Sequence, residues 1–305
     1  MENTKKIIII SIFIIFMLSI TLAIVFWFNN NNQESVNTNQ ENNKIENNNE
    51  INNNQEDNNE TKDNEPTKEN NIIEDNKDNK KENISVTKDK NIIFFGDSIT
   101  AGFGSKSKHY SWANYIGTKY DFASYMNAGI SDYRVSTYDN ANKWLVTQVK
   151  NHYNDKNNYD YVIMQGGIND LLYNTPLGEL AKDKDFKSFN KDTFYGGLEL
   201  YLYNTISKWN KAKIGYIITY YTPNYKERGK SWTYDDYKKY NDALKKTLNK
   251  WNIPYLDLFD GEYNNQKFSD LLKVTTKEYL GDYLHLNDAG YNLISPIIYE
   301  WIKTI

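Results

Sequence analysis

Short apolar runs alternate with amphipathic stretches from residue 91 to the end of the chain, and this alternation limits the fold more than any other feature. Five short runs are typical of buried strands: Ile92–Phe95, Ser124–Ala128, Tyr161–Gln165, Ile214–Tyr220 and Tyr255–Leu258. Five longer stretches are typical of helices: Ser111–Tyr120, Asn140–His152, Thr193–Asn210, Tyr234–Trp251 and Ala289–Lys303. Apolar strands that alternate with helices predict a parallel sheet with helices on both faces. The sequence therefore predicts one α/β domain over residues 91–305.

The first predicted strand ends in a polar loop, Gly96-Asp97-Ser98-Ile99-Thr100, which places a serine at the carboxyl end of a strand. Ligands of open α/β sheets bind at that end of the strands. A serine hydroxyl becomes a nucleophile when a base lies within hydrogen-bond reach. The position of Ser98 therefore predicts a catalytic serine, provided that a histidine reaches it.

Few residues can supply that base, because the chain contains only three histidines, His109, His152 and His285. His152 falls near the end of a predicted helix, away from the strand ends, and is expected at the surface. His109 follows the first strand and could line a cleft. His285 follows Asp282 by three residues in the loop before the last helix. On a turn, this spacing lets the carboxylate accept from imidazole Nδ1, which leaves Nε2 free to face a serine.

Attack by a serine on a carbonyl group also needs hydrogen-bond donors for the oxyanion that develops. The second strand runs into Gly129, whose backbone N–H can approach a substrate closely; an ordinary turn glycine is the alternative. The third strand runs into Gly-Ile-Asn-Asp at residues 167–170, which puts the Asn169 carboxamide at its tip. An Asn in a turn often caps the local backbone instead. Asp97 and Asp170 are expected to brace their loops through backbone hydrogen bonds.

These blocks occur in order at successive strand ends, and residues from about 91 to 303 resemble the SGNH hydrolase superfamily, also called the GDSL esterases and lipases. The matching motifs are Gly-Asp-Ser-Ile at 96–99, Gly129, Gly-x-Asn-Asp at 167–170 and Asp-x-x-His at 282–285. The resemblance implies that Ser98 is the nucleophile, His285 the general base and Asp282 the residue that orients the histidine. It also implies an oxyanion hole made by the backbone N–H groups of Ser98 and Gly129 and the side-chain amide of Asn169.

The fold that this resemblance implies is a flavodoxin-like three-layer α/β/α sandwich, with a five-stranded parallel sheet in the order 2-1-3-4-5. No Gly-x-Ser-x-Gly elbow occurs in the sequence, which argues against the α/β-hydrolase fold. The chain has no cysteine, which excludes disulfides and thiolate zinc sites. No spacing of histidines or acidic residues suits a metal, so we expect neither a cofactor nor a metal. The domain is close to electrically neutral, so we expect no nucleic-acid partner.

The sequence says less about the identity of the substrate than about the type of reaction. Members of the superfamily act on lipids, thioesters, aryl esters and acetylated sugars. We predict a serine esterase that hydrolyses O-acetyl or other short acyl esters on a cell-wall or other polysaccharide. A lipase or lysophospholipase, an acyltransferase to surface glycans and a non-catalytic binding module are the alternatives. Four aromatic residues next to the catalytic motifs are predicted to contact the substrate: Tyr110, Trp112, Tyr173 and Tyr283.

An apolar run of 22 residues, Ile7–Phe28, lies near the N-terminus. It is long enough for a membrane-crossing helix, which needs about 20 residues, and longer than the ~7–15 apolar residues of a cleaved signal peptide. Lys5 and Lys6 precede it and acidic residues dominate after it, so the positive-inside rule places the N-terminus in the cytoplasm. We predict an uncleaved signal anchor over residues 1–28 and a catalytic domain on the extracellular side. Secretion after signal cleavage and a buried soluble helix are the alternatives.

Residues 29–90 are rich in Asn, Glu and Lys, and they carry 8 Lys against 15 Asp and Glu. Such a segment buries too little apolar surface to offset the entropy of ordering, so we predict a disordered linker. A flexible chain of this length spans on the order of 45 Å. The predicted organisation is therefore an anchor, a linker over residues 29–90 and a hydrolase domain over residues 91–305.

Overall fold

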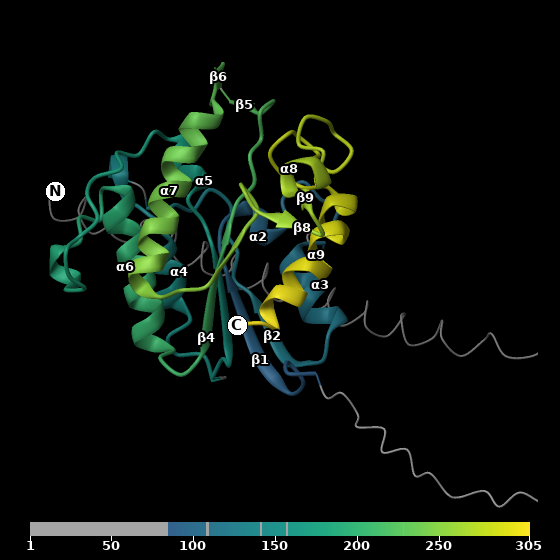
Figure 1. The fold of residues 1–305 in the computed structure, drawn as a ribbon. Coiled ribbons are helices and arrows are strands. Elements are labelled where there is room, and N and C mark those ends of the chain that lie inside the picture. The colour runs from purple at the N-terminus through teal and green to yellow at the C-terminus, as the bar shows by residue number, and fades with distance from the viewer. Residues whose placement is uncertain (1–84, 108–109, 141, 157, 228) are drawn as a thin grey trace, which may run out of the picture. The chain divides into compact units, whose positions relative to one another are not determined.

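The computed structural model describes residues 85–107, 110–140, 142–156, 158–227 and 229–305 (Figure 1). The predicted membrane anchor and nearly all of the predicted linker lie outside these residues. Within the described ranges, no helix is both long enough and apolar enough to cross a membrane.

Five parallel strands form the central sheet, in the order β2-β1-β3-β4-β7. They are β1 (Lys90–Phe95), β2 (Phe122–Asn127), β3 (Tyr161–Gln165), β4 (Lys213–Ile218) and β7 (Tyr255–Asp257). Because β7 is the fifth strand of this sheet along the chain, the order is the predicted 2-1-3-4-5. The predictions of an α/β fold and of a five-stranded parallel sheet are confirmed.

Helices cover both faces of the sheet (Figure 1). On one face, α3 (Trp112–Lys119) packs against α9 (Asp288–Ile302). On the other face, α6 (Phe194–Lys208) packs against both α4 (Leu145–Asn151) and α7 (Tyr234–Trp251). The loops at the carboxyl ends of the strands are left free of these helices, and the candidate site lies there.

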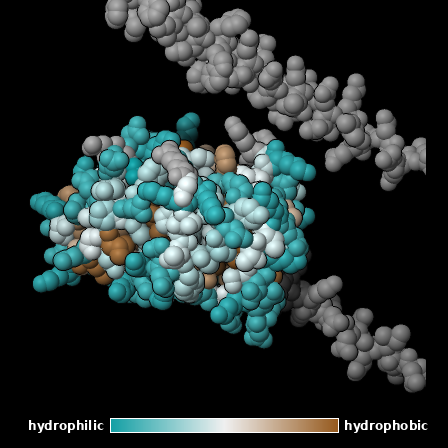
Figure 2. All heavy atoms as spheres, turned by 90° about the horizontal axis from the view of Figure 1, so that it is seen from above, coloured by the Kyte–Doolittle hydropathy of each residue, from teal (hydrophilic) through white to brown (hydrophobic). Residues whose placement is uncertain are grey.

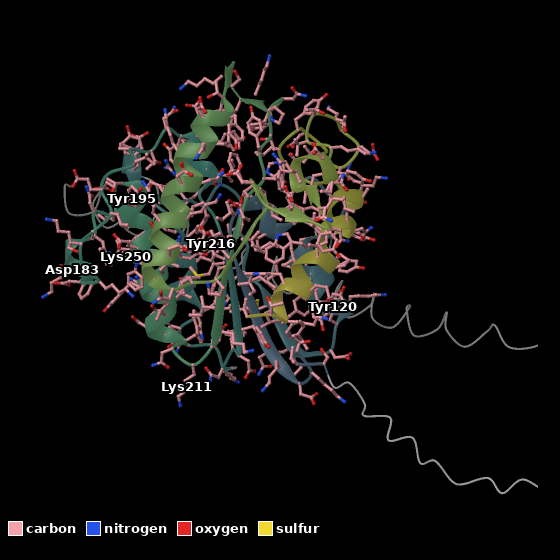
Figure 3. All side chains as sticks on the ribbon, viewed as in Figure 1. Tyr120, Asp183, Tyr195, Lys211, Tyr216 and Lys250 are labelled. Atoms are coloured by element: carbon pink, nitrogen blue, oxygen red, sulfur yellow. The ribbon has the colours of Figure 1, made fainter. Side chains whose placement is uncertain are left out.

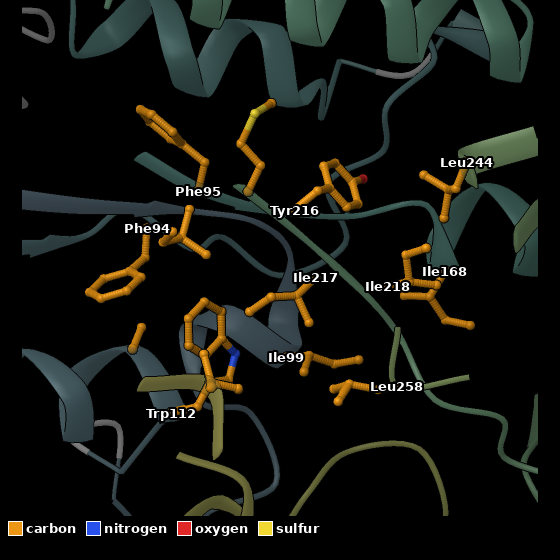
Figure 4. Close-up of a cluster of buried hydrophobic side chains, with 14 of the residues drawn as sticks. Phe94, Phe95, Ile99, Trp112, Ile168, Tyr216, Ile217, Ile218, Leu244 and Leu258 are labelled. Atoms are coloured by element: carbon orange, nitrogen blue, oxygen red, sulfur yellow. The ribbon is translucent and has the colours of Figure 1, made fainter. Parts of the chain in front are cut away.

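The hydrophobic core is divided by β1, where successive side chains point to opposite faces of the sheet. Phe94 meets Trp112 of α3, with ring centroids 5.2 Å apart. Phe95 points the other way and meets Trp209 at the end of α6, with ring centroids 5.5 Å apart. Figure 4 shows Phe94 and Phe95 on opposite sides of the strand. This burial on both faces explains why the first predicted strand is a continuous apolar run.

Several of the shortest elements were not predicted, because a segment of a few residues shows no measurable periodicity. The short strands β3 and β7 were predicted, since each lies in a mainly apolar run. The predicted helix over residues 140–152 begins only at Leu145. Asp139 interrupts the preceding short 3-10 helix in a left-handed conformation, with φ 57°. The other unpredicted elements are α2 (Ser98–Ala101), α5 (Ile168–Leu172), α8 (Phe268–Leu271), the 3-10 helices η1 (Tyr138–Asn140) and η2 (Phe186–Ser188), and the hairpins β5–β6 (Lys226–Glu227, Lys230–Ser231) and β8–β9 (Glu262–Tyr263, Gln266–Lys267).

The folded domain begins before the predicted boundary at residue 91. Thr87 is fully buried, and its hydroxyl lies 2.8 Å from the hydroxyl of Tyr299 in α9. Ser85 Oγ lies 3.0 Å from the same Tyr299 hydroxyl. These hydroxyl contacts attach a segment that the polar composition assigned to the linker.

Candidate active site

Ser98, His285 and Asp282 form a continuous chain of hydrogen bonds. Ser98 Oγ lies 2.8 Å from His285 Nε2, across a separation of 187 residues. His285 Nδ1 lies 2.7 Å from Asp282 Oδ2. Ser98 is the first residue of α2, directly after β1, and the other two residues lie in the loop before α9. The fold therefore brings together the three side chains that the sequence motifs predict to act together.

Asp282 is held in its ionised form. Its Oδ1 accepts from the backbone N–H groups of Leu284, at 3.0 Å, and of His285, at 2.7 Å. Partial burial raises the pKa of the carboxyl, but the hydrogen bonds from the side chain and backbone of His285 outweigh burial and lower the pKa to about 2. The ionised carboxylate therefore accepts a hydrogen bond from the Nδ1–H group of His285. This leaves Nε2 without a proton and able to accept a hydrogen bond from the Ser98 hydroxyl.

Two buried glutamines hold the loop that carries Ser98. Gln148 of α4 contacts Gly96 twice: Oε1 accepts from its N–H at 3.0 Å, and Nε2 donates to its carbonyl at 2.9 Å. Gln165, at the end of β3, accepts from the Thr100 hydroxyl at 2.8 Å and donates to Asp97 Oδ2 at 2.9 Å. A Cβ on Gly96 would lie 2.6 Å from Gln165 Oε1, so only glycine fits against this network.

Asp97 and Asp170 brace their loops, as predicted. Asp97 Oδ1 accepts from the N–H of Ile99 at 3.0 Å, and burial raises the pKa of the Asp97 carboxyl. Asp170 accepts from the backbone N–H groups of Val135, at 2.9 Å, and Ser136, at 3.1 Å. Burial raises the pKa of Asp170 to about 6, although these hydrogen bonds act in the opposite direction.

Replacing Gln165 by leucine is expected to destabilise the domain. Gln165→Leu removes the donor to the fully buried Asp97 carboxyl, and a buried polar group that loses its partner costs about 2–3 kcal/mol. Urea denaturation at pH 7 measures the free energy of unfolding. Gln266→Leu is the control, because Gln266 is exposed in β9 and should stay within about 0.5 kcal/mol of the wild type. Equal stability of the two variants would contradict this role of Gln165.

Two of the three predicted oxyanion donors lie beside the triad. Ser98 and Asn169 both line a cavity there, together with His285. Asn169 Nδ2 donates to the carbonyl of Tyr133 at 3.0 Å, which fixes the amide and leaves its second N–H for a ligand. Ser98 is the first residue of α2, and the first N–H groups of a helix have no partner within it.

Gly129 is placed differently from the other two predicted donors. Its N–H donates to Asn127 Oδ1 at 3.0 Å, and Gly129 does not line the cavity beside Ser98. A Cβ on Gly129 would lie 2.4 Å from the backbone nitrogen of Ala101. The close approach of this loop to α2 therefore explains the glycine, and its role in an oxyanion hole stays a prediction.

Of the four predicted aromatic contacts, only Tyr173 lines this cavity. The prediction for Trp112 is wrong: its side chain is 1% exposed and packs in the core beside Phe94, because it begins the helix that covers this face of the sheet (Figure 4). Tyr110 is exposed, and the Tyr283 ring lies under the Lys277 ammonium, 4.9 Å from its centroid. Substrate contacts by Tyr110 and Tyr283 stay predictions.

His152 does not join the hydrogen-bonded chain. His109 lies outside the described residues. His152 is expected at the surface, and its side chain is partly exposed, at 21%. Its Nδ1 lies 2.8 Å from Asp155 Oδ2, and its ring packs edge-on against Phe95.

The cavity beside Ser98 has a volume of about 150 Å3 and is lined by both apolar and polar side chains. Phe103 packs edge-on against the imidazole of His285, with ring centroids 4.6 Å apart, and forms part of an apolar wall. Tyr225 and Glu227 line the polar side, and sequence reasoning missed both because no motif marks their segment. The other lining residues are Ser131, Asp132, Leu172 and Leu284.

A larger cavity, of about 570 Å3, is lined by residues 178–199 and contains none of the three triad residues. Lys250 of α7 donates to the carbonyls of two of its lining residues, Ala181 at 2.8 Å and Asp183 at 2.5 Å. Figure 3 shows Lys250 and Asp183 on the same outer side of the domain. Lys250 also pairs with the buried Glu199. In the ranges that the structure covers, no group of three or more His, Cys, Asp or Glu side chains is placed to hold a metal ion.

Comparisons with known proteins agree with this geometry. The sequence matches the GDSL-like Lipase/Acylhydrolase family over residues 94–293. No curated protein matches the chain. A solved structure of a protein from Lactobacillus plantarum has a TM-score of 0.55 and 20% identity, covering 71% of this chain and 98% of that one.

Two further solved structures are similar over nearly their whole length. The psychrotrophic esterase EstA from Pseudoalteromonas sp. has a TM-score of 0.50 and 18% identity, covering 71% of this chain and 98% of that one. The aryl esterase of M. smegmatis has a TM-score of 0.50 and 12% identity, covering 70% of this chain and 99% of that one. At such low sequence identity, these structural similarities show that the proteins share a fold and nothing more.

Proposed function

Because the chain belongs to the GDSL-like lipase/acylhydrolase family and is a carboxylic ester hydrolase, we propose that Ser98 is its nucleophile, His285 its general base and Asp282 the residue that orients the base. The observation that carries this proposal is the hydrogen-bonded chain from Ser98 Oγ through both imidazole nitrogens to the Asp282 carboxylate. A weak nucleophile, a base and an orienting acid within hydrogen-bond reach form the arrangement that acyl transfer requires.

The proposed reaction proceeds through an acyl-enzyme. Ser98 Oγ attacks the ester carbonyl carbon while its proton moves to His285 Nε2, and the oxyanion is stabilised by the Asn169 amide and the Ser98 N–H. Collapse of the tetrahedral intermediate breaks the bond to the leaving alcohol, which takes the proton from His285. Water then gives a proton to His285 and attacks the acyl group, which releases the acid and restores Ser98. Asp282 stays ionised and stabilises the imidazolium formed in each half of the reaction.

We propose that the ester is a short acyl group, such as acetyl, on a polysaccharide. The cavity of about 150 Å3 is small beside the roughly 300–1,000 Å3 of pockets that bind drug-sized ligands, which favours a short acyl group. Figure 2 views the side on which α8 and the β5–β6 hairpin lie, and its surface is mostly hydrophilic with small separate apolar patches. A hydrophilic surface around the site favours a sugar over a lipid substrate.

Acyl-chain preference tests this substrate class. We expect kcat/KM to fall about tenfold, or ~1.4 kcal/mol in transition-state stabilisation, between the acetyl and octanoyl esters of 4-nitrophenol. The reason is that an eight-carbon chain extends beyond the apolar wall at Phe103 and Leu284. Stopped-flow or steady-state release of 4-nitrophenol measures the profile. An enzyme that prefers dodecanoyl esters would instead favour the lipase alternative.

We further propose that the enzyme is anchored in a membrane and acts outside it, where cell-wall or surface polysaccharides lie. This proposal is based on the apolar run Ile7–Phe28 and on Lys5 and Lys6 before it. The full-length protein should remain in the membrane pellet after carbonate extraction, and a chain that lacks residues 1–28 should not. Recovery of both proteins in the supernatant would overturn the anchor.

A further inference from the structure

A second cavity adjoins the one that contains Ser98. It has a volume of about 140 Å3, and it shares Leu172, Tyr173 and Glu227 with the first. Asn174, Lys230 and Trp232 complete its lining. A ligand whose ester group lies at Ser98 can therefore extend past Tyr173 and Glu227 into this second space.

Tyr173 forms a rigid aromatic wall between the two cavities. The Arg134 guanidinium lies 4.3 Å from the centroid of its ring, and its hydroxyl donates to Asp132 Oδ1 at 3.1 Å. Lys143 in turn holds the other oxygen of Asp132 at 2.8 Å. The N–H of Tyr173 donates to the carbonyl of Asn169 at 2.9 Å, so the wall has a fixed position relative to that amide.

Among the residues that the structure describes, one carboxylate oxygen of Glu227 has no hydrogen-bond partner. The Tyr225 hydroxyl donates to Glu227 Oε2 at 3.2 Å, and the Tyr225 ring stacks at 17° on Trp232. Glu227 Oε1 accepts no hydrogen bond from the parts of the chain that the structure describes, and no cation there forms an ion pair with it. The carboxylate is therefore oriented by one oxygen while the other stays available to a ligand.

Two further polar groups face the second cavity without a partner among the described residues. One is the carboxamide of Asn174, which can both donate and accept hydrogen bonds. The other is the ammonium of Lys230, which can only donate them. Together with Glu227, these groups provide both hydrogen-bond donors and hydrogen-bond acceptors. The negative charge of Glu227 and the positive charge of Lys230 cancel. An acyl chain in this space would form no hydrogen bond with any of these groups, whereas a polar ligand can bond to all three. A cationic ligand would be repelled by the ammonium of Lys230.

We propose that the second cavity is a leaving-group subsite that binds one neutral sugar ring of an O-acylated glycan. In it, Glu227 and Asn174 hydrogen-bond the ring hydroxyls, and Tyr173 packs against the ring face. The ester oxygen of the same sugar then lies toward Ser98. This inference rests on the proposed function of Ser98 and adds the part of the substrate that the enzyme recognises.

The test compares two kinds of acetyl ester on the full-length enzyme. One is 4-nitrophenyl acetate, whose leaving group carries no hydroxyl to donate to Glu227. The other is a panel of O-acetylated oligosaccharides from xylan, cellulose and peptidoglycan, assayed by acetate release. Glu227→Ala and Asn174→Ala should each lower kcat/KM for the best sugar ester tenfold to hundredfold, mainly through KM, and lower it for the aryl ester by a clearly smaller factor.

Glu262→Ala is the matched control, since Glu262 is an exposed glutamate in the other short hairpin, β8–β9. Its kcat/KM should equal that of the wild type on both kinds of ester. Thermal unfolding of all three variants separates recognition from folding, and Asn174 tests the subsite from a segment other than the β5–β6 hairpin.

Equal effects of Glu227→Ala and Asn174→Ala on both esters, or no effect on either, would overturn the subsite and leave the Ser98 mechanism intact. A wild-type enzyme that prefers the aryl ester to every sugar in the panel would also overturn it. Full activity of Ser98→Ala would instead overturn the proposed function itself.

Discussion

Ser98→Ala is expected to lower kcat/KM for ester hydrolysis roughly 10^4–10^6-fold and to leave the fold intact. The lost hydroxyl is the group that lies 2.8 Å from His285 Nε2, and the mechanism has no other nucleophile to replace it. The Ser98 backbone is unaffected, so its carbonyl still accepts from the N–H groups of Gly102 and Phe103. Hydrolysis of 4-nitrophenyl acetate measures the rate, and circular dichroism measures the fold.

A fluorophosphonate probe provides an independent readout, because it forms a covalent bond with an activated serine. The wild type should be labelled at Ser98, and Ser98→Ala should not be labelled. Ser188→Ala is the control, since Ser188 is exposed and donates only to groups in its own turn. Labelling of Ser98→Ala at wild-type level would show that another residue is the nucleophile.

Activity is expected to rise with pH from mildly acidic to neutral conditions, because a general base of the imidazole type accepts a proton only in its neutral form. Asp282 does not cause this rise, since its pKa of about 2 keeps it ionised over the whole range. Asp282→Asn should lower kcat about 10^2–10^4-fold, since a neutral amide neither selects the required tautomer nor stabilises the imidazolium. A pH–rate profile of both proteins between pH 4.5 and 8, measured with 4-nitrophenyl acetate, tests this prediction.

Asp170 needs a control in the same experiment, because burial raises its pKa to about 6 and it lies next to Asn169. Its raised pKa means that protonation favours the folded state, so its contribution to stability falls as the pH rises from about 4 to about 6. Asp282 has the opposite sign: its contribution is present above the unfolded pKa of about 3.9 and is lost as the pH falls through about 2. Neither change makes the folded state less stable between pH 7 and pH 5. If Asp170→Asn abolished the acid limb of the profile, the assignment to His285 would be wrong.

The fold was predictable to the extent that burial leaves a local signal in the sequence. The predicted bounds of β3 and α7 match the structure, because β3 is buried on both faces and α7 shows its apolar stripe over five turns. The segment before α4 was not predictable, since the left-handed Asp139 depends on its surroundings. Trp112 was assigned to the site because it is close to Ser98 in sequence, although helix packing turns it into the core.

The sequence by itself determined the family of this protein, because the motifs that mark it are local. Ser98 and Asn169 follow β1 and β3, whose carboxyl ends meet at one edge of the sheet, and Asp282 precedes His285 by three residues within one loop. The tertiary structure alone decided what surrounds them: that Gln148 and Gln165 hold the serine loop, and that Gly129 packs against α2. It also placed Glu227, whose residue type carries no motif, beside Tyr173. Such contacts depend on which distant segments of the chain pack together, and the sequence pattern of a single strand or helix does not show its partners.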